Sequence, residues 1–141
     1  MHLSAVCVAS RVLSNVWWPV SLNTADHSSE KAIALWLNSS IGLLMLLGHR
    51  EETAGPWVGF KKTVLESMPV IDVTRLSANQ LARLAAAFDE IADLSVAPFR
   101  EMADDPTRAA IDDAIREALD LPDFSILREL LAREPIISGS L

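Results

Sequence analysis

The sequence contains a single cysteine, Cys7, and little that would mark the chain for export. One thiol cannot form an internal disulfide, so nothing in the composition calls for an oxidising compartment. No lysine or arginine precedes the short apolar run at the N-terminus, and Arg11 interrupts that run, whereas a signal peptide needs a positive start and an unbroken apolar core. We therefore expect no signal peptide and a cytoplasmic location.

A hydrophobic run long enough to cross a membrane is also lacking. The most apolar stretch extends from Ile33 to Leu47, which falls short of the roughly 20 mainly apolar residues of a spanning helix. Asn38, Ser39 and Ser40 also interrupt it. Apolar residues make up 50% of the chain, which is enough to form a hydrophobic core. We therefore interpret the stretch as a buried helix and expect no membrane association.

Residue patterns that mark catalytic or cofactor sites are missing too. The three histidines, His2, His27 and His49, are far apart and lack neighbouring metal ligands, so no local zinc pattern exists. The five glycines form neither a phosphate-binding loop nor a dinucleotide fingerprint, and no nucleophile elbow is present. The sequence therefore predicts no catalytic residue, no metal ligand and no cofactor in this chain, and leaves open whether the protein is part of an enzyme.

Two carboxylate pairs, Asp104–Asp105 and Asp112–Asp113, could take part in acid–base chemistry or metal binding. Acidic residues ahead of a helix complement its dipole, and those on an outer helix face are solvated. We interpret both pairs in this way, with Asp112 on the solvent face of its helix, four residues before Arg116.

The first part of the chain predicts strands around one apolar helix. β-branched and aromatic side chains favour strands, and short runs of them are separated by turn-forming residues. The helix is expected from about residue 30 to Leu47, with Gly48 as its end. Two of the strand candidates flank Lys61 and Lys62. The strand candidates are residues 3–9, 16–22, 57–60 and 69–73.

The second part of the chain has the period of amphipathic helices. Ser77 and Gln80 form a capping box ahead of the first, and Asp105 with Pro106 starts the second. Asp123 is expected to cap a third.

These patterns predict an α+β fold, with a small mixed α/β part in residues 1–75 and a three-helix tail in residues 76–141. The net charge of −7 is divided unevenly between the two parts. Residues 1–75 hold six basic and six acidic residues, whereas the tail holds six arginines and thirteen acidic residues. Only the first part could contact a polyanion without strong electrostatic repulsion, since an acidic surface repels nucleic acid.

The segment from Gly48 to Lys62 is the best candidate for a functional site. Its basic side chains offer donors for phosphate oxygens, and Trp57 offers a flat apolar surface. An ordinary solvated loop, in which Glu51 and Glu52 offset the positive charge, is the competing interpretation. The candidate DNA-binding residues are Arg11, His49, Arg50, Trp57, Lys61 and Lys62.

Four short pieces follow one another in a recognisable order. Leu37–Ser39 lies in the apolar helix, Gly55–Lys62 supplies a glycine-containing loop and short strand, Leu65–Pro69 ends on Met-Pro, and a long helix follows from Ser77. This order resembles the C-terminal specificity (target-recognition) region of type IIG-like N6-adenine DNA methyltransferases and other restriction-modification proteins. The resemblance covers roughly residues 11–95, about the length of a partial module.

The resemblance implies a DNA-sequence-recognition module whose partners are double-stranded DNA and an S-adenosylmethionine-dependent methyltransferase domain or subunit. The Asn/Asp-Pro-Pro-aromatic catalytic motif and the glycine-rich methyl-donor site of that family are absent from the sequence, so a fragment or separate specificity part is implied. Phosphate contacts would position the module, loop side chains such as Arg50 would reach base edges, and the acidic tail would face away from DNA.

A helical protein-interaction module with no nucleic-acid role is the alternative. In that case the Leu81–Phe88 face of the first tail helix would dock on a partner chain.

Overall fold

The computed structural model describes residues 3–10, 19–23, 26–52 and 58–135, and this part of the chain is mostly helical. Helix accounts for 62% of it and strand for 3%, so the predicted α+β fold is wrong. Strand within the described residues is limited to one antiparallel hairpin, in which Glu51 pairs with Gly59 and Glu52 with Val58.

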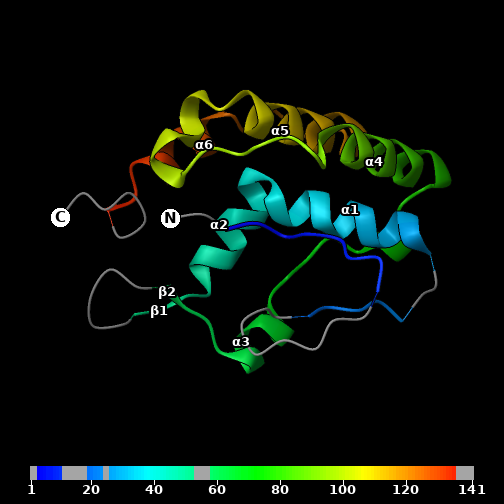
Figure 1. Ribbon diagram of the computed structural model, residues 1–141, viewed down its shortest axis with the longest axis horizontal. Coiled ribbons are helices and arrows are strands. Elements are labelled where there is room, and N and C mark those ends of the chain that lie inside the picture. Colours follow the sequence, from blue (N-terminus) through cyan, green and yellow to red (C-terminus); the bar gives the residue numbers. More distant parts are fainter. Residues whose placement is uncertain (1–2, 11–18, 24–25, 53–57, 136–141) are drawn as a thin grey trace.

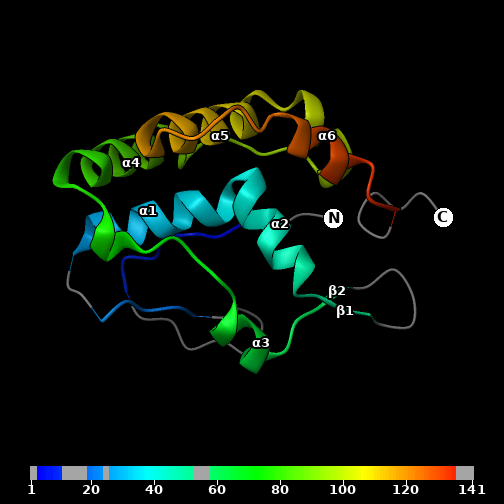
Figure 2. The same ribbon diagram turned by 180° about the vertical axis from the view of Figure 1, so that it is seen from behind.

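The longer helices pack in two layers, and a smaller limb extends below them. Helices α4, α5 and α6 lie together on one side of α1, and α3 and the β1–β2 hairpin lie on the other side (Figure 1, Figure 2). We call residues 50–52 and 58–67, which hold the hairpin and α3, the limb. The elements are α1 (His27–Asn38), α2 (Ser40–Gly48), β1 (Glu51–Glu52), β2 (Val58–Gly59), α3 (Lys62–Ser67), the 3-10 turn η1 (Val73–Arg75), α4 (Ala78–Ile91), the 3-10 helix η2 (Phe99–Asp104), α5 (Pro106–Leu119) and α6 (Ile126–Ala132).

Helices α1 and α2 form an elbow, where the sequence predicted one continuous helix. Their axes differ by 72°, and the break lies at Ser39. The Ser39 hydroxyl donates to the Trp36 carbonyl at 2.6 Å and accepts from the Gly42 N–H at 3.2 Å. One buried side chain therefore ends α1 and caps α2, which is why the apolar run does not continue as a single helix.

The starts of α4 and α5 agree with the sequence. The Ser77–Gln80 capping box is confirmed, with both of its reciprocal hydrogen bonds present. Pro106 is at the start of α5 and the Asp105 carboxylate accepts from the Thr107 N–H at 2.9 Å. The prediction for Asp123 is wrong, because its carboxylate bonds to Ser125 in the turn before α6 and does not cap the helix.

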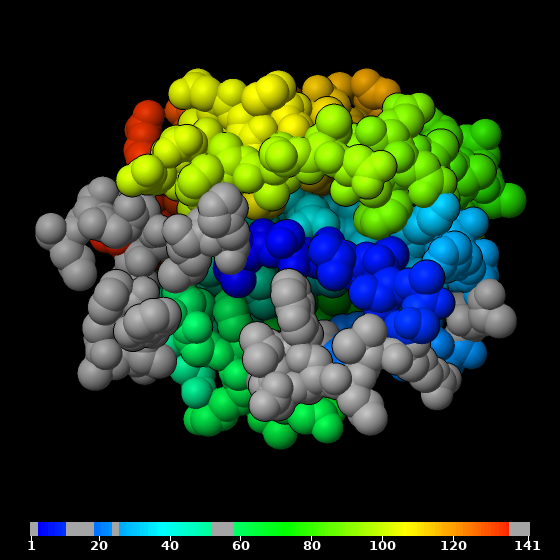
Figure 3. Space-filling model, in the orientation of Figure 1, coloured from blue at the N-terminus to red at the C-terminus, as the bar shows by residue number. Residues whose placement is uncertain are grey.

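The N-terminal strand candidate, residues 3–9, is extended but makes no strand pairing with other described residues. Its side chains alternate between half-buried and exposed positions, as a strand would. The Asn38 side chain replaces a neighbouring strand by accepting from the Ala5 N–H at 3.0 Å and donating to the Ala5 carbonyl at 2.8 Å. Figure 3 shows this segment, in blue, lying at the surface of the molecule.

The other strand candidates are only partly matched. Residues 19–22 of the second candidate are not in a strand, and its residues 16–18 lie outside the described part. In the third, Val58–Gly59 is strand β2, while Trp57 lies outside the described part. Residues 69–73 form no strand, since Pro69 cannot donate to a ladder and η1 begins at Val73.

One hydrophobic core crosses from the first part of the chain to the second. Leu35 and Trp36 of α1 pack with Leu84 of α4 and with Ile111 and Ile115 of α5. A second cluster joins Leu43 and Leu47 of α2 to the segment around η2 and to α6. Helix α1 therefore packs in the first core, whereas α2 contacts both: Ile41 and Met45 pack against the first core, and Leu43 and Leu47 belong to the second.

None of the helices in the described residues combines the length and hydropathy needed to cross a membrane. Helices α1 and α2 meet that requirement only jointly, across their 72° bend.

Replacing Gly42 with Ala tests whether close packing at the elbow matters. A Cβ at residue 42 would lie 2.1 Å from the Trp36 carbonyl oxygen, so the elbow would have to open. We expect a loss of unfolding free energy of at least about 2 kcal/mol, measured by urea denaturation. Gly48→Ala is the control, because a Cβ there meets nothing within 4 Å; it should be neutral or stabilise by up to about 1 kcal/mol. Equal effects of the two variants would contradict the role given to Gly42.

Candidate nucleic-acid interface

The limb begins where α2 ends and returns to the helical body through α3. The hairpin register places Glu51 opposite Gly59, which brings Arg50 and Lys61 to neighbouring ends of the two strands. Lys61 is the N-cap of α3, and its ammonium group is free of the helix start because an ammonium can only donate. The backbone of a short hairpin and a short helix thus presents basic side chains from both ends of one loop.

Lys61 and Lys62 are the most open of the candidate residues that the structure describes. Their side chains are 66% and 70% exposed. The Lys61 ammonium pairs with Glu51 across the hairpin, and Lys62 lies 3.6 Å from Glu66 one turn along α3. Pairs this exposed contribute only about 0–1 kcal/mol, so a phosphate can replace either carboxylate at little cost.

His49 and Arg50 are half-buried and engaged. The His49 Nδ1 atom lies 2.7 Å from the Met45 carbonyl, and because a carbonyl can only accept, this nitrogen carries a proton. An Nη2 atom of Arg50 donates to the Glu134 carboxylate at 2.7 Å. Glu134 follows α6, so Arg50 joins the limb to the far end of the helical body.

Arg11 and Trp57 lie outside the described residues. The structure therefore describes four of the six candidates. Lys61 and Lys62 are exposed, whereas His49 and Arg50 are half-buried and bonded to residues outside the limb. Glu51, which the sequence offered as a charge-neutralising residue, does pair with Lys61.

The acidic half of the chain contains a buried polar network that the sequence interpretation missed. Asp112 was expected at the solvent face of its helix, but the residue is only 3% exposed. Its carboxylate accepts from the Ser40 N–H and from the Ser40 hydroxyl, both at 2.7 Å, and from Arg128 at 2.8 Å. Arg116 instead pairs with Asp113, at 3.4 Å. Asp112 is thus an internal anion at the N-terminus of α2, where the helix dipole stabilises negative charge.

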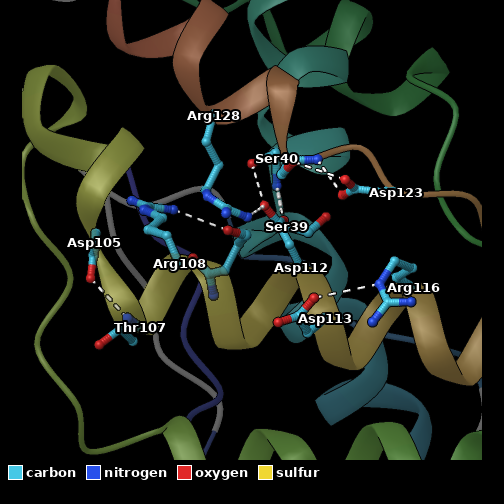
Figure 4. Close-up of polar contacts among 12 residues, drawn as sticks. Ser39, Ser40, Asp105, Thr107, Arg108, Asp112, Asp113, Arg116, Asp123 and Arg128 are labelled. Atoms are coloured by element: carbon cyan, nitrogen blue, oxygen red, sulfur yellow. Dashed lines mark hydrogen bonds and ion pairs between the residues drawn. The ribbon is translucent and has the colours of Figure 1, made fainter.

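Arg108 completes this network from one turn earlier on α5. It is 1% exposed, donates to the carbonyls of Asn38 and Leu3, and lies over the Phe99 ring at 5.7 Å. Burial lowers the pKa of its guanidinium, while the carboxylates of Asp105 and Asp112 raise that pKa. An arginine stays charged in either case. Figure 4 shows Arg108, Asp112 and Arg128 gathered beside Ser39 and Ser40.

A signal for this network was present in the sequence. Arg108 and Asp112 lie at helical spacing on the same stripe of α5 as Ile111 and Ile115, which are 3% and 0% exposed. Charged residues at core positions indicate a buried pair that needs partners from other elements. Asp105, expected ahead of the helix as a complement to its dipole, is 6% exposed, and its carboxylate accepts from the N–H groups of Ala97 and Thr107.

The described residues contain no group of three or more His, Cys, Asp or Glu side chains placed to hold a metal ion. Comparison of the chain with protein-family models, with curated proteins and with solved structures finds no match.

Replacing Asp112 with Ala tests the buried network. The change leaves the mostly buried Arg128 guanidinium and the α2 N-terminus without their anion, so we expect a loss of about 3–5 kcal/mol of unfolding free energy. The matched control is Asp113→Ala on the same helix, where the side chain is 64% exposed and the expected loss is about 0–1 kcal/mol. Both values come from chemical denaturation; a small, equal loss in the two variants would contradict the network's role.

Proposed function

We propose that this chain is a DNA-recognition module without catalytic activity of its own. It acts in the cytoplasm with an S-adenosylmethionine-dependent N6-adenine DNA methyltransferase or restriction-modification enzyme, whose catalytic domain or subunit is its protein partner. Double-stranded DNA is the ligand, and the limb is the surface that contacts it. The order of sequence motifs suggests the class, and the placement of charge on the fold supports the surface.

The observation that carries this proposal is the exposure of two adjacent lysines on the limb. Lys61 and Lys62 reach solvent at the start of α3, and their described partners, Glu51 and Glu66, belong to the limb itself. Neither lysine is held by the acidic helices. A duplex approaching this side meets two cations whose local pairs are weak and screened by salt.

The opposite side of the molecule carries the excess of negative charge. Exposed carboxylates on α4 and α5 include Asp89, Glu90, Asp113 and Glu117. These helices lie across α1 from the limb (Figure 1). The charge distribution therefore favours one orientation on a polyanion, with the limb toward the phosphates and the acidic helices away from them.

The lysines and the arginine of the limb would contact different groups of the duplex. The lysines contact phosphates and position the module, since an ammonium group is a compact point charge. Arg50, at the edge of the hairpin, can bind a guanine through two hydrogen bonds in a recognised sequence and a phosphate in a mixed-sequence duplex, because a guanidinium fits both.

A helical interaction module remains the second candidate, and one observation favours it. Ile126 and Leu130 are 55% and 56% exposed and lie one turn apart on α6. The Leu81–Phe88 face, on which this candidate was first based, packs instead against the core shared with α1. A docking face on α6 would cause association that Ile126→Ser with Leu130→Ser removes in sedimentation.

Reversing the charge of both limb lysines tests the DNA-binding surface. We expect Lys61→Glu with Lys62→Glu to abolish binding to a mixed-sequence duplex at low salt. Two phosphate contacts are lost, so milder Lys→Gln changes should lower the slope of log K against log salt by about 1.8. Fluorescence anisotropy across about 50–200 mM salt measures both effects.

The matched control reverses Arg83 and Arg116, which changes the net charge equally but on α4 and α5. This control should bind nearly as well as the unchanged chain. If the two double variants lose binding equally, only net charge matters and the limb is not the contact surface.

A further inference from the structure

The Arg50–Glu134 pair differs from every other contact of the limb cations that the structure describes. Lys61 and Lys62 pair with residues of the limb, whereas Glu134 lies two residues beyond the end of α6. The two side chains are 26% and 23% exposed, and Nη2 and Oε1 are 2.7 Å apart. A half-buried pair is screened less by salt than an open one, so it persists where the lysine pairs are weakened.

Packing next to this contact fixes its geometry. Helix α2, which ends just before Arg50, lies against α6, and Leu43 and Leu47 share a core cluster with Leu131. Arg50 is therefore held close to the end of α6 by the fold. Its guanidinium donates a hydrogen bond to a carboxylate oxygen, and the same N–H groups would donate to a phosphate oxygen or to an acceptor on a base edge.

We propose that Glu134, two residues after α6, competes with DNA for Arg50 and so regulates the limb. This inference rests on the proposed function. In the closed state Glu134 occupies the Arg50 guanidinium, and of the described limb cations the two lysines are available to the duplex. In the open state Arg50 is released and adds a third cationic contact. The contribution of Arg50 to the apparent affinity for DNA is limited by the fraction of molecules that are open.

Glu134→Gln tests this competition, because it removes the charge of the competitor with little change in size. We expect affinity for a mixed-sequence duplex to rise roughly three- to tenfold at low salt, and the slope of log K against log salt to steepen by about 0.9, as one more phosphate contact forms. Fluorescence anisotropy on the full chain gives both values, and circular dichroism checks that the fold is retained.

Two controls separate release of Arg50 from a general loss of negative charge. Glu129→Gln removes the same charge from α6, where Glu129 is 52% exposed and pairs with Arg133, and it should raise affinity much less. Arg50→Gln combined with Glu134→Gln should cancel the gain. An equal gain from Glu129→Gln, or a gain that persists without Arg50, overturns the competition.

The same measurements distinguish failure of this inference from failure of the proposed function. If the chain binds DNA through Lys61 and Lys62 but Glu134→Gln changes neither affinity nor slope, the competition is wrong and the DNA-binding surface stands. If no variant binds DNA, Glu134→Gln included, both are wrong.

Discussion

The hydrogen bonds of the Asp112 carboxylate at the N-terminus of α2 hold the elbow and, through it, the position of the limb. The carboxylate binds the first N–H and hydroxyl of α2 and one guanidinium of α6, so a residue of α5 joins three helices at one point. Arg108 holds the end of α1 and the N-terminal segment beside it. A buried ion pair stabilises little by itself, but an unpaired carboxylate here would be costly, so the elbow is held in the geometry that pairs Asp112. The Nε atoms of Arg108 and Arg128 are buried without a hydrogen-bond partner among the described residues. The direction of α2 then determines where the limb lies.

The helical part of the fold was largely predictable, and the strands were not. Capping residues and apolar spacing are local signals, which is why the starts of α4 and α5 were found. The elbow could not be derived in the same way, because Ser39 acts through Trp36 and Gly42 and the adjoining Ser40 depends on a carboxylate 72 residues away. The strand predictions failed for a related reason. Strand propensity describes a half-buried extended segment, and residues 3–9 meet that description against a side chain of α1 without joining a sheet.

The sequence showed which residues of the candidate site are basic, but not which of their side chains are exposed and which are paired in the fold. The sequence showed that basic residues cluster around the hairpin, and it could not show that Lys61 and Lys62 are open while Arg50 is engaged. That difference depends on Glu134, which is 84 residues away and reaches the limb only through packing of α2 on α6. Asp112 shows the opposite error: it was expected to be exposed and is buried. A carboxylate four residues before an arginine on a helix has the pattern of a solvated surface pair. The sequence signal against a surface pair was the position of Asp112 on the apolar stripe of Ile111 and Ile115, and burial in the fold confirms it.

Titration of the chain with a short duplex, followed by backbone amide chemical shifts, is the measurement that shows whether the limb contacts DNA. The shifts locate the contacted surface without any substitution. If the limb binds DNA, shift changes will be concentrated at residues 50–52 and 58–67, with the outer faces of α4 and α5 unaffected and the two cores unchanged. Changes centred on α4 and α5, or no changes on the limb at a duplex concentration that saturates binding, would contradict DNA binding by the limb.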